Sequence, residues 1–395
     1  MKIVDGIGAL EEEMTATRRD IHANPEIGYQ EVRTSGLVAD KLKSWGIEVH
    51  GGYGKTGLAG VLRGRKEGSK RIGLRADMDC LHIEELTNLP YASKNKGKMH
   101  ACGHDGHTAM LLGAAHHLAL NPDFAGEVCF IFQPAEEGGA GAQAMVDDGL
   151  FSKFPCERVY GMHNMPDIPQ GHFGIRPGPI MAAADRWTVT FNGTGGHGGA
   201  NVHLSTDPIM ALGQFITAVQ TIVSRSVPAL DSAVVSIGHV AGGTFGSPNV
   251  IPASVLVRGT TRTFTEETRK ICEIRMKELA DGIAAANRVE AVVDHAPGYP
   301  PLRNDADCVR VAAETARELV GAEQVDDNLE PITASEDFGY LLGENRPGAF
   351  IMIGGGKPGG KRSPGIHTPD YDFNDGILTL GASYWVKLVQ RELVA

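Results

Sequence analysis

The chain has 395 residues, of which 42% are hydrophobic and 22% charged, so it holds enough apolar material for more than one globular core. Its 37 Lys and Arg against 48 Asp and Glu give a net charge of −11, which argues against a nucleic acid partner. No apolar run approaches the roughly 18 residues of a membrane span, and the first residues lack an apolar signal core. We therefore expect a cytoplasmic protein without a membrane partner.

The six cysteines are scattered through the chain without CxxC spacing. This distribution suits a reducing compartment better than a disulfide framework. Only Cys102 has histidine neighbours, and we expect the other five to be small buried hydrophobic residues.

Helical and strand patterns alternate through the first part of the chain. Apolar spacing predicts helices at 10–21 and 34–45, followed by a strand at 57–62. The next strand, 71–79, ends in Asp77 and Asp79, which are spaced to share one face. A capping or turn pair is the ordinary explanation for two such carboxylates.

Residues 99–107 place three imidazoles, a thiol and a carboxylate just ahead of an apolar helix expected at 108–120. If the backbone is extended from Cys102 to His104, these two side chains point the same way and can converge on one ion. A polar cap at the start of the helix explains the stretch equally well. The remaining chain has to decide between the two.

Further strands deliver polar residues near their C-terminal ends. The apolar run 128–132 is typical of a strand buried on both faces of a parallel sheet, and Glu136 and Glu137 follow it. A strand at 158–162 delivers His163. After a helix expected at 308–319, a strand at 349–353 precedes His367. Open α/β sheets bind ligands at the C-terminal ends of their strands, so these polar residues are candidates for a functional site.

The hydrophobic pattern changes between about 183 and 296. Alternating residues at 187–191 predict a strand with one exposed face, and a helix begins near Asp207. Strands at 233–240 and 254–260, a helix at 266–286 and a strand at 288–295 complete a β-α-β-β-α-β order. We expect 183–296 to be a second domain inserted between 1–182 and 297–395. Its exposed sheet edges are a plausible homodimer contact.

The residues near the strand ends of the first domain could form one site. They supply one thiolate, three imidazoles and two carboxylates, enough for two divalent ions of the Zn, Mn, Co or Ni type with one glutamate to spare: Cys102, His104, Glu136, Glu137, His163 and His367. Hydrolysis requires at least a metal-bound water and a carboxylate that can accept its proton. A structural metal site needs no such base. If the chain is extended at the two glutamates, they point apart, so one can ligate while the other faces a substrate.

Ordered motifs lie along nearly the whole chain, at 18–26, 75–79, 100–107, 133–138, 161–163 and 335–338. Together they resemble the M20 metallopeptidase family, in its branch of aminoacylases, hippurate hydrolases and auxin-conjugate hydrolases. The resemblance implies an α/β fold, with a mixed-sheet metallohydrolase catalytic domain and an inserted ferredoxin-like (βαββαβ) lid and dimerisation domain. It also implies a homodimer, or a larger homo-oligomer, assembled through the lid domain.

The resemblance implies an amidohydrolase that splits small-molecule N-acyl amino acids, hippurate-like or N-acetylated, into a carboxylic acid and a free amino acid. Four alternatives remain open. The substrate could be a dipeptide or another carboxypeptidase substrate, or an N-acetylated diaminopimelate on the same site. The site could instead hold a single metal, or the chain could be a metal-binding protein without catalysis.

The resemblance also assigns roles to individual residues. It makes Cys102 the bridging ligand of a two-metal site whose terminal ligands are His104, Glu137, His163 and His367. It implies that Glu136 is the general base and Asp79 a partner that supports the ligands from behind.

In the inserted domain, the resemblance makes His197 a donor from the partner subunit to the substrate carbonyl oxygen. Asn249 and Arg262 match positions that bind the substrate carboxylate, for which a guanidinium group is suited. Without the resemblance, His197 would be an exposed histidine in a glycine-rich loop and Arg262 a surface charge. Two departures from the family pattern concern substrate choice: the loop 197–203, and Cys80 with His82 after the strand that carries Asp79.

Overall fold

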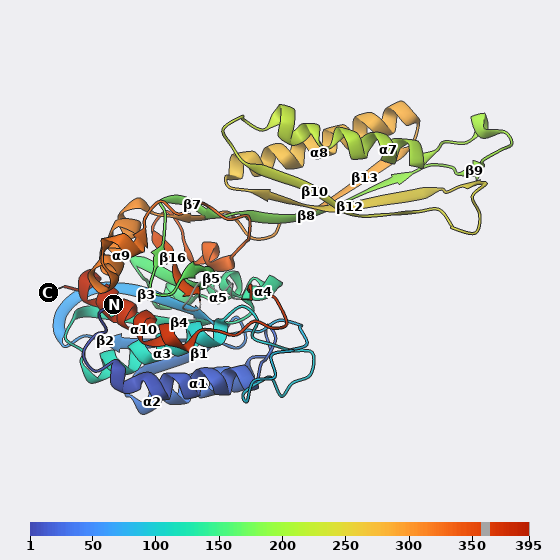
Figure 1. The fold of residues 1–395 in the computed structure, drawn as a ribbon. Coiled ribbons are helices and arrows are strands. Elements are labelled where there is room, and N and C mark those ends of the chain that lie inside the picture. Colours follow the sequence, from blue (N-terminus) through green and yellow to red (C-terminus); the bar gives the residue numbers. More distant parts are fainter. Residues whose placement is uncertain (357–363, 395) are drawn as a thin grey trace. The chain divides into compact units, whose positions relative to one another are not determined.

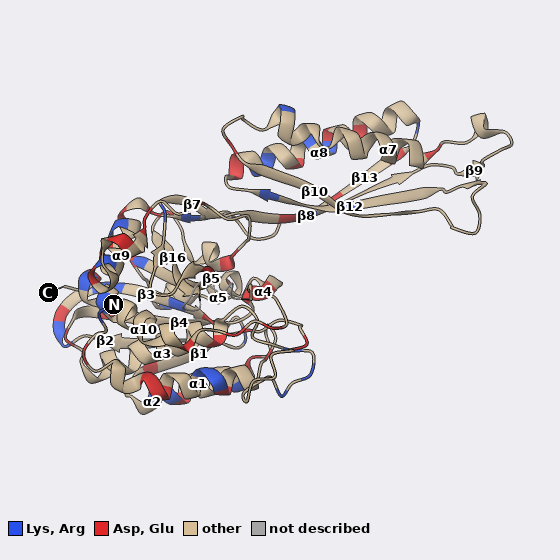
Figure 2. Cartoon of the chain, viewed as in Figure 1, with Lys and Arg blue, Asp and Glu red and all other residues tan. Residues whose placement is uncertain are grey.

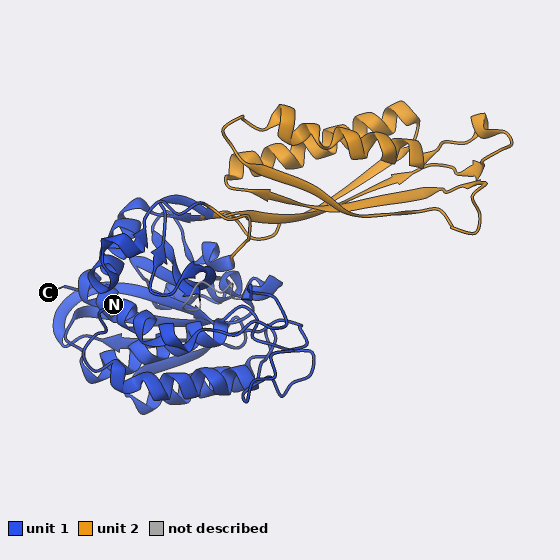
Figure 3. Ribbon diagram, in the orientation of Figure 1, with its two compact units in different colours: residues 1–180, 303–330, 337–395 blue, residues 181–302, 331–336 orange. Residues whose placement is uncertain are grey.

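The computed structural model describes residues 1–356 and 364–394, and its elements are labelled in Figure 1. The chain forms two compact units, which Figure 3 distinguishes by colour. Unit 1 comprises Met1–Ile180, Arg303–Glu330 and Asp337–Ala395, and unit 2 comprises Met181–Leu302 and Pro331–Glu336. Unit 2 is therefore inserted into unit 1, and residues 331–336 return to it.

Unit 1 is built on an eight-stranded sheet with the order β1-β2-β4-β3-β5-β16-β6-β15. Its strands are β1 Glu48–Tyr53, β2 Gly57–Arg63, β3 Lys66–Asp77, β4 Ala125–Gln133, β5 Arg158–Pro169, β6 Phe173–Gly174, β15 Val325–Asp326 and β16 Gly348–Gly356. The central pairs β4/β3, β3/β5 and β5/β16 are parallel, whereas β1/β2, β2/β4 and β16/β6 are antiparallel. The expected mixed-sheet α/β fold is confirmed. A separate two-stranded sheet pairs β7 Gly178–Met181 with β14 Leu302–Asn304.

Five longer helices flank this sheet: α1 Glu11–Ala23, α2 Val32–Ser44, α3 His104–Leu120, α9 Ala306–Val320 and α10 Leu378–Glu392. Helix α3 packs against α1 and α10, and nearly all of its side chains are buried. Charged residues of both signs lie along α1 and α2 (Figure 2). Shorter helices α4 Glu136–Gly139, α5 Gly141–Asp147 and α6 Leu150–Lys153 follow β4.

Unit 2 has a four-stranded antiparallel sheet with the order β10-β12-β8-β13. Along the chain its main elements are β8 Ala183–Asn192, α7 Pro208–Ala218, β10 Ala233–Gly242, β12 Ser254–Thr263, α8 Glu266–Asn287 and β13 Glu290–Ala296. Both helices cover the same face of the sheet (Figure 1) and enclose a core around Trp187 and Phe215. The element order is the β-α-β-β-α-β of the sequence analysis.

Local sequence explains where the helices of unit 2 begin. The Asp207 side chain accepts a hydrogen bond from the N–H of Ile209, and Pro208 occupies the first turn. The Thr265 side chain caps α8 in the same way by accepting from the N–H of Thr268. No helix among the described residues is both long and apolar enough to cross a membrane.

Candidate metal centre

The loop that carries Cys102 is not extended, so that assumption of the sequence analysis is wrong. Gly103 has φ 99° and ψ 13°, and helix α3 begins directly after it at His104. A Cβ atom at Gly103 would lie 2.1 Å from Oδ1 of Asn164, which only glycine avoids. The thiol and the imidazole approach each other through a left-handed turn into a helix, not through the alternation of a strand.

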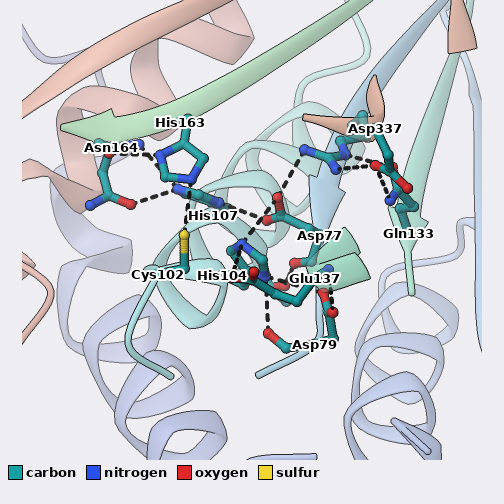
Figure 4. A network of polar contacts seen from close by, with 12 residues as sticks. Asp77, Asp79, Cys102, His104, His107, Gln133, Glu137, His163, Asn164 and Asp337 are labelled. Carbon is teal, nitrogen blue, oxygen red and sulfur yellow. Dashed lines mark hydrogen bonds and ion pairs between the residues drawn. The ribbon is translucent and has the colours of Figure 1, made fainter. Parts of the chain in front are cut away.

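His104 is oriented by Asp79, the residue that the family resemblance implied as a partner of the ligands. Its Nδ1 lies 2.9 Å from the backbone oxygen of Asp79 and 3.2 Å from Oδ1 of the same residue. Its Nε2 is buried and has no hydrogen-bond partner among the described residues. Figure 4 shows this ring between Asp79 and the neighbouring polar groups. The arrangement is one by which carboxylates orient metal-binding histidines.

Glu136 and Glu137 lie in the short turn that follows β4, and they too are not extended as assumed. Ala135 before them and Ala140 after the turn both have left-handed backbones, with φ of 52° and 53°. Each glutamate brings a carboxylate oxygen within 4.8 Å of a ring nitrogen of His104, so the two do not point apart. The Glu137 N–H donates to Oδ2 of Asp79 at 2.9 Å, which ties the turn to the end of β3.

Two further histidines reach the Cys102 thiol. His163 lies within β5, which continues past the predicted end, and its Nε2 is 3.3 Å from Sγ of Cys102. Its Nδ1 is fixed 2.7 Å from the backbone oxygen of Asn164. His367 has a left-handed backbone, with φ of 64°, and its Nε2 lies 3.3 Å from Sγ of Cys102 and 3.3 Å from Oε1 of Glu137.

These donors form two sets that share the Cys102 sulfur. In each set the donor atoms lie within 4.8 Å of one another: Cys102, His104 and His163 in the first, and Cys102, Glu137 and His367 in the second. Nε2 of His104 is buried without a hydrogen-bond partner in the described chain, as a donor atom awaiting a cation would be. The residues present therefore fit two divalent ions bridged by one thiolate.

In the protein without metal, electrostatics favour the neutral forms of His163 and Cys102 but the charged forms of the other two ligand histidines. Burial lowers the pKa of His104, but the charges of Asp77 and Cys102 outweigh it and raise that pKa well above its ordinary value, and hydrogen bonds with Cys102 and Glu137 raise the pKa of His367 to about 10. Burial holds the pKa of His163 well below its ordinary value, and the neighbouring His107 adds to this effect. Burial also raises the pKa of the Cys102 thiol, and the Glu137 carboxylate raises it further. A divalent cation at this position would favour the thiolate instead, so metal binding and loss of the thiol proton are coupled.

A group of buried polar residues (His107, Asp77 and Asn164) lies behind the candidate ligands and was not assigned a role from the sequence. His107 places Nδ1 2.6 Å from Oδ1 of Asp77 and Nε2 2.7 Å from Oδ1 of Asn164, and its ring packs edge-on to His163 at 4.5 Å. The other oxygen of Asp77 accepts from Arg75 at 2.8 Å. Asn164 could have been suspected because it directly follows a candidate ligand.

Arg75 connects these residues to the neighbouring strand ends, where Figure 4 labels Gln133 and Asp337. Its Nε donates to Oε1 of Gln133 at 2.8 Å, and Gln133 in turn donates to Oδ1 of Asp337 at 2.7 Å. Oδ2 of Asp337 accepts from the N–H of Ala142 at 3.0 Å. This buried network holds the ends of β3 and β4 in register beside the candidate ligands.

The structure brings His197 and Asn249 together within unit 2. The short strands β9 Gly196–His197 and β11 Val250–Ile251 pair so that His197 faces Val250, and the N–H of Gly198 donates to the Asn249 oxygen at 2.7 Å. Both side chains are exposed. They lie at the end of the unit where β12 begins.

Arg262 lies near the other end of β12 and is not brought together with His197 and Asn249 within the unit. It pairs with Ala184 at the start of β8, and its guanidinium donates to the backbone oxygen of Thr261 at 3.0 Å. With a rise of about 3.3 Å per residue, the eight steps from Ser254 to Arg262 span about 26 Å.

The two departures from the family pattern differ in their environment. Cys80 is buried. Burial and, to a lesser extent, the charge of Asp79 raise its pKa to about 12, so its thiol stays protonated. His82 is exposed. In the altered loop, Asn201 has a left-handed φ of 57° ahead of a short 3-10 helix, Val202–Leu204, whose Leu204 is exposed.

Known proteins resemble the chain along its whole length. It is 42% identical over 394 residues to the hippurate hydrolase of Campylobacter jejuni, covering 100% of both proteins. It is 44% identical over 352 residues to the N-acetyl-L-cysteine deacetylase of Bacillus subtilis, covering 88% of this chain and 82% of that one. Among solved structures, a Bacillus subtilis dinuclear metal-binding peptidase of the M20 family superposes with a TM-score of 0.84 at 36% identity, covering 98% and 99% of the two chains.

The family match agrees with the site. Residues 73–391 match the family described as Peptidase family M20/M25/M40, and they include every candidate ligand from Cys102 to His367. The dinuclear neighbour and the two donor sets around Cys102 support two divalent metal ions. The chain belongs to Peptidase family M20/M25/M40.

Proposed function

We propose that this chain is a metal-dependent amidohydrolase that cleaves N-acyl amino acids into a carboxylic acid and a free amino acid. The observation that carries the proposal is the pair of donor sets sharing Cys102, with a further carboxylate, Glu136, beside them. The relatives named hippurate hydrolase and N-acetyl-L-cysteine deacetylase, at 42% and 44% identity, support amide substrates of this class.

In this proposal Cys102, His104, Glu137, His163 and His367 would hold the two ions, and the Cys102 sulfur belongs to both donor sets. When bound, the two ions supply Lewis acidity to the amide carbonyl and to the attacking water. Glu136 is the general base because its carboxylate is nearly buried, lies next to Glu137 and is not needed by either set around Cys102. It takes the proton of the attacking water and passes it to the nitrogen of the leaving amine.

The mixture of sulfur, nitrogen and oxygen donors selects borderline metals such as Zn, Mn, Co or Ni over Ca or Mg. We propose that one of these four is the native metal. The six cysteines are all free and buried, which supports the cytoplasm as the location of the protein.

The residues of unit 2 support a homodimer, or a larger homo-oligomer built from it. In this proposal His197 holds the carbonyl oxygen, and Asn249 and Arg262 hold the substrate carboxylate. Arg262 lies about 26 Å along β12 from the end that carries the other two, which exceeds the length of an amino acid derivative. Two chains can share one substrate if one supplies Arg262 and its partner supplies His197 and Asn249. The exposed edges of β10 and β13 offer surfaces for that contact.

The test is amine release from N-acetyl, N-benzoyl and long-chain N-acyl amino acids by metal-stripped protein resupplied with Zn, Mn, Co or Ni in turn. We expect metal-dependent turnover of at least one member of this panel. Dipeptides and N-acetylated diaminopimelate form the second panel, and turnover of these alone would move the substrate assignment. Two bound ions without turnover of any substrate would contradict the enzyme assignment.

A further inference from the structure

A segment near the N-terminus contacts both ends of the turn that carries the two glutamates. We call residues 135–139 the base turn and residues 28–31 the brace segment. The brace segment follows α1 and is anchored beside β3, because Ile27 bridges to Cys80 and the Cys80 N–H donates to the Glu26 oxygen at 2.9 Å. More than a hundred residues of sequence separate it from the base turn.

Glu31 holds the first residue of the base turn. Its side chain is fully buried, and Oε1 accepts the backbone N–H of Ala135 at 2.8 Å. Oε2 accepts the hydroxyl of Thr56 at 2.6 Å. Ala135 has φ 52° and ψ 44°, a left-handed conformation that costs alanine about 1–2 kcal/mol and persists only where its surroundings enforce it.

Gly28 and Tyr29 hold the rest of the turn. A Cβ atom at Gly28 would lie 3.0 Å from both Cα and Cβ of Ala135, so the two backbones are in close contact. The Tyr29 hydroxyl donates to the backbone oxygen of Gly139 at 2.6 Å, which fixes the far end of the turn. Tyr29 itself has a left-handed φ of 63°. Strained residues thus lie on both sides of this contact.

We propose that Glu31 is a positioning residue for catalysis, which holds Ala135 in its left-handed conformation and thereby aims the Glu136 carboxylate. Gly28 and Tyr29 assist by closing the contact around the turn. This inference rests on the proposed role of Glu136 as the base. Glu31 acts through the backbone of the turn and touches neither substrate nor metal.

The chain offers variants that separate this role from ordinary stabilisation. Glu31→Ala removes the acceptor and frees Ala135 to relax, whereas Glu31→Gln keeps an oxygen for the Ala135 N–H. Asp148→Ala is the matched control, because Asp148 also accepts one backbone N–H of a turn, from Gly54 at 2.7 Å, without contacting the base turn. Tyr29→Phe removes only the bond to the Gly139 oxygen.

Hydrogen exchange of peptides covering 133–141 gives the first readout, because it needs neither metal nor activity. We expect Glu31→Ala to lose protection in this segment and Glu31→Gln and Asp148→Ala to keep it. Equal protection in Glu31→Ala and wild type would overturn the proposal. If wild type turns over no substrate, the proposed function fails, while this measurement still reports on the turn.

Turnover gives the second readout. We expect Glu31→Ala to lower kcat about tenfold or more with KM within about threefold of wild type, because a small misorientation of a catalytic group costs rate, not binding. Glu31→Gln should recover most of kcat, and Asp148→Ala should leave kcat unchanged. If Glu31→Ala does not fold, Tyr29→Phe replaces it, with a smaller loss of kcat expected. Unchanged kcat in both variants, or equal losses in Glu31→Ala and Glu31→Gln, would refute the role of the acceptor.

Discussion

Glu136 and Glu137 are adjacent, chemically identical and both within reach of His104, yet they should respond differently to the same substitution. Glu136→Gln removes the proposed base and leaves all five proposed ligands. We expect kcat to fall by several powers of ten while two metal ions per chain remain bound, as judged by turnover and elemental analysis.

Glu137→Gln is the matched control for that measurement. An amide is a weaker ligand than a carboxylate, so this variant should lose one ion and, with it, activity. Near-normal turnover of Glu136→Gln would remove Glu136 from the mechanism. Loss of metal from Glu136→Gln instead of Glu137→Gln would exchange the two roles.

Asp79 makes two contacts that serve the ligands, one to the His104 ring and one to the Glu137 N–H. We expect Asp79→Ala to weaken metal binding about 10- to 100-fold, because partners behind a ligand fix its tautomer and orientation. Competition with a chelator measures this change directly. Asp148→Ala serves as the control and should match wild type in metal affinity. Equal affinity in Asp79→Ala would show that the backbone oxygen of Asp79 alone is enough to orient His104.

At the scale of secondary structure, one carboxylate ties the end of α10 to two central strands. Glu392 is buried, accepts from Arg158 of β5 at 2.8 Å, and also pairs with Lys70 of β3 and the hydroxyl of Tyr160. Burial would raise the pKa of Glu392, but the hydrogen bonds from Lys70, Tyr160 and Arg158 outweigh it and lower the pKa below 4.5.

A carboxyl whose pKa is lowered in the folded state stabilises the protein above its unfolded pKa, and that stabilisation is lost as pH falls through the folded pKa. We expect Glu392→Gln to reduce the free energy of unfolding by about 1–3 kcal/mol near pH 7. The difference from wild type should shrink below about pH 4. Urea unfolding at several pH values tests this, with the half-exposed Glu318→Gln as a control expected to change little. A pH-independent difference would exclude the ionised carboxylate as its cause.

The order of most of the longer helices and strands could be predicted from the sequence, because apolar periodicity reports burial directly. The edge strand β1 was not predicted, because its residues are mostly exposed or half-buried and include two glycines. Local conformations that depend on contacts with residues distant in sequence could not be predicted. The helix after Cys102 begins at His104, four residues before the predicted start, because Gly103 turns the chain where Asn164 leaves no room for a side chain. Likewise, β5 continues to Pro169 because β16 pairs with it across that stretch.

At the scale of the whole molecule, the candidate metal ligands of unit 1 could be gathered from the sequence because their chemistry is visible in their residue types, and the structure brings them together. Residues that support them were harder to find. His107, Asn164 and Glu31 act through partners up to about a hundred residues away, which periodicity does not encode. For unit 2, the element order was predictable, but not the placement of His197 and Arg262 at opposite ends of it.

That placement predicts that two chains complete each active site, and subunit mixing tests it. Glu136→Gln and His197→Ala should each be inactive alone. In a mixed dimer, the His197→Ala chain supplies an intact Glu136 and the Glu136→Gln chain an intact His197, so one of the two sites is complete. Random reassociation of equal amounts makes half of the dimers mixed, so we expect about a quarter of wild-type activity to return. Chains that carry two different affinity tags, captured together through both tags in turn, measure the exchange of subunits. Full exchange without recovered activity would show that His197 serves its own chain, and the 26 Å separation along β12 would then require a different residue to bind the substrate carboxylate.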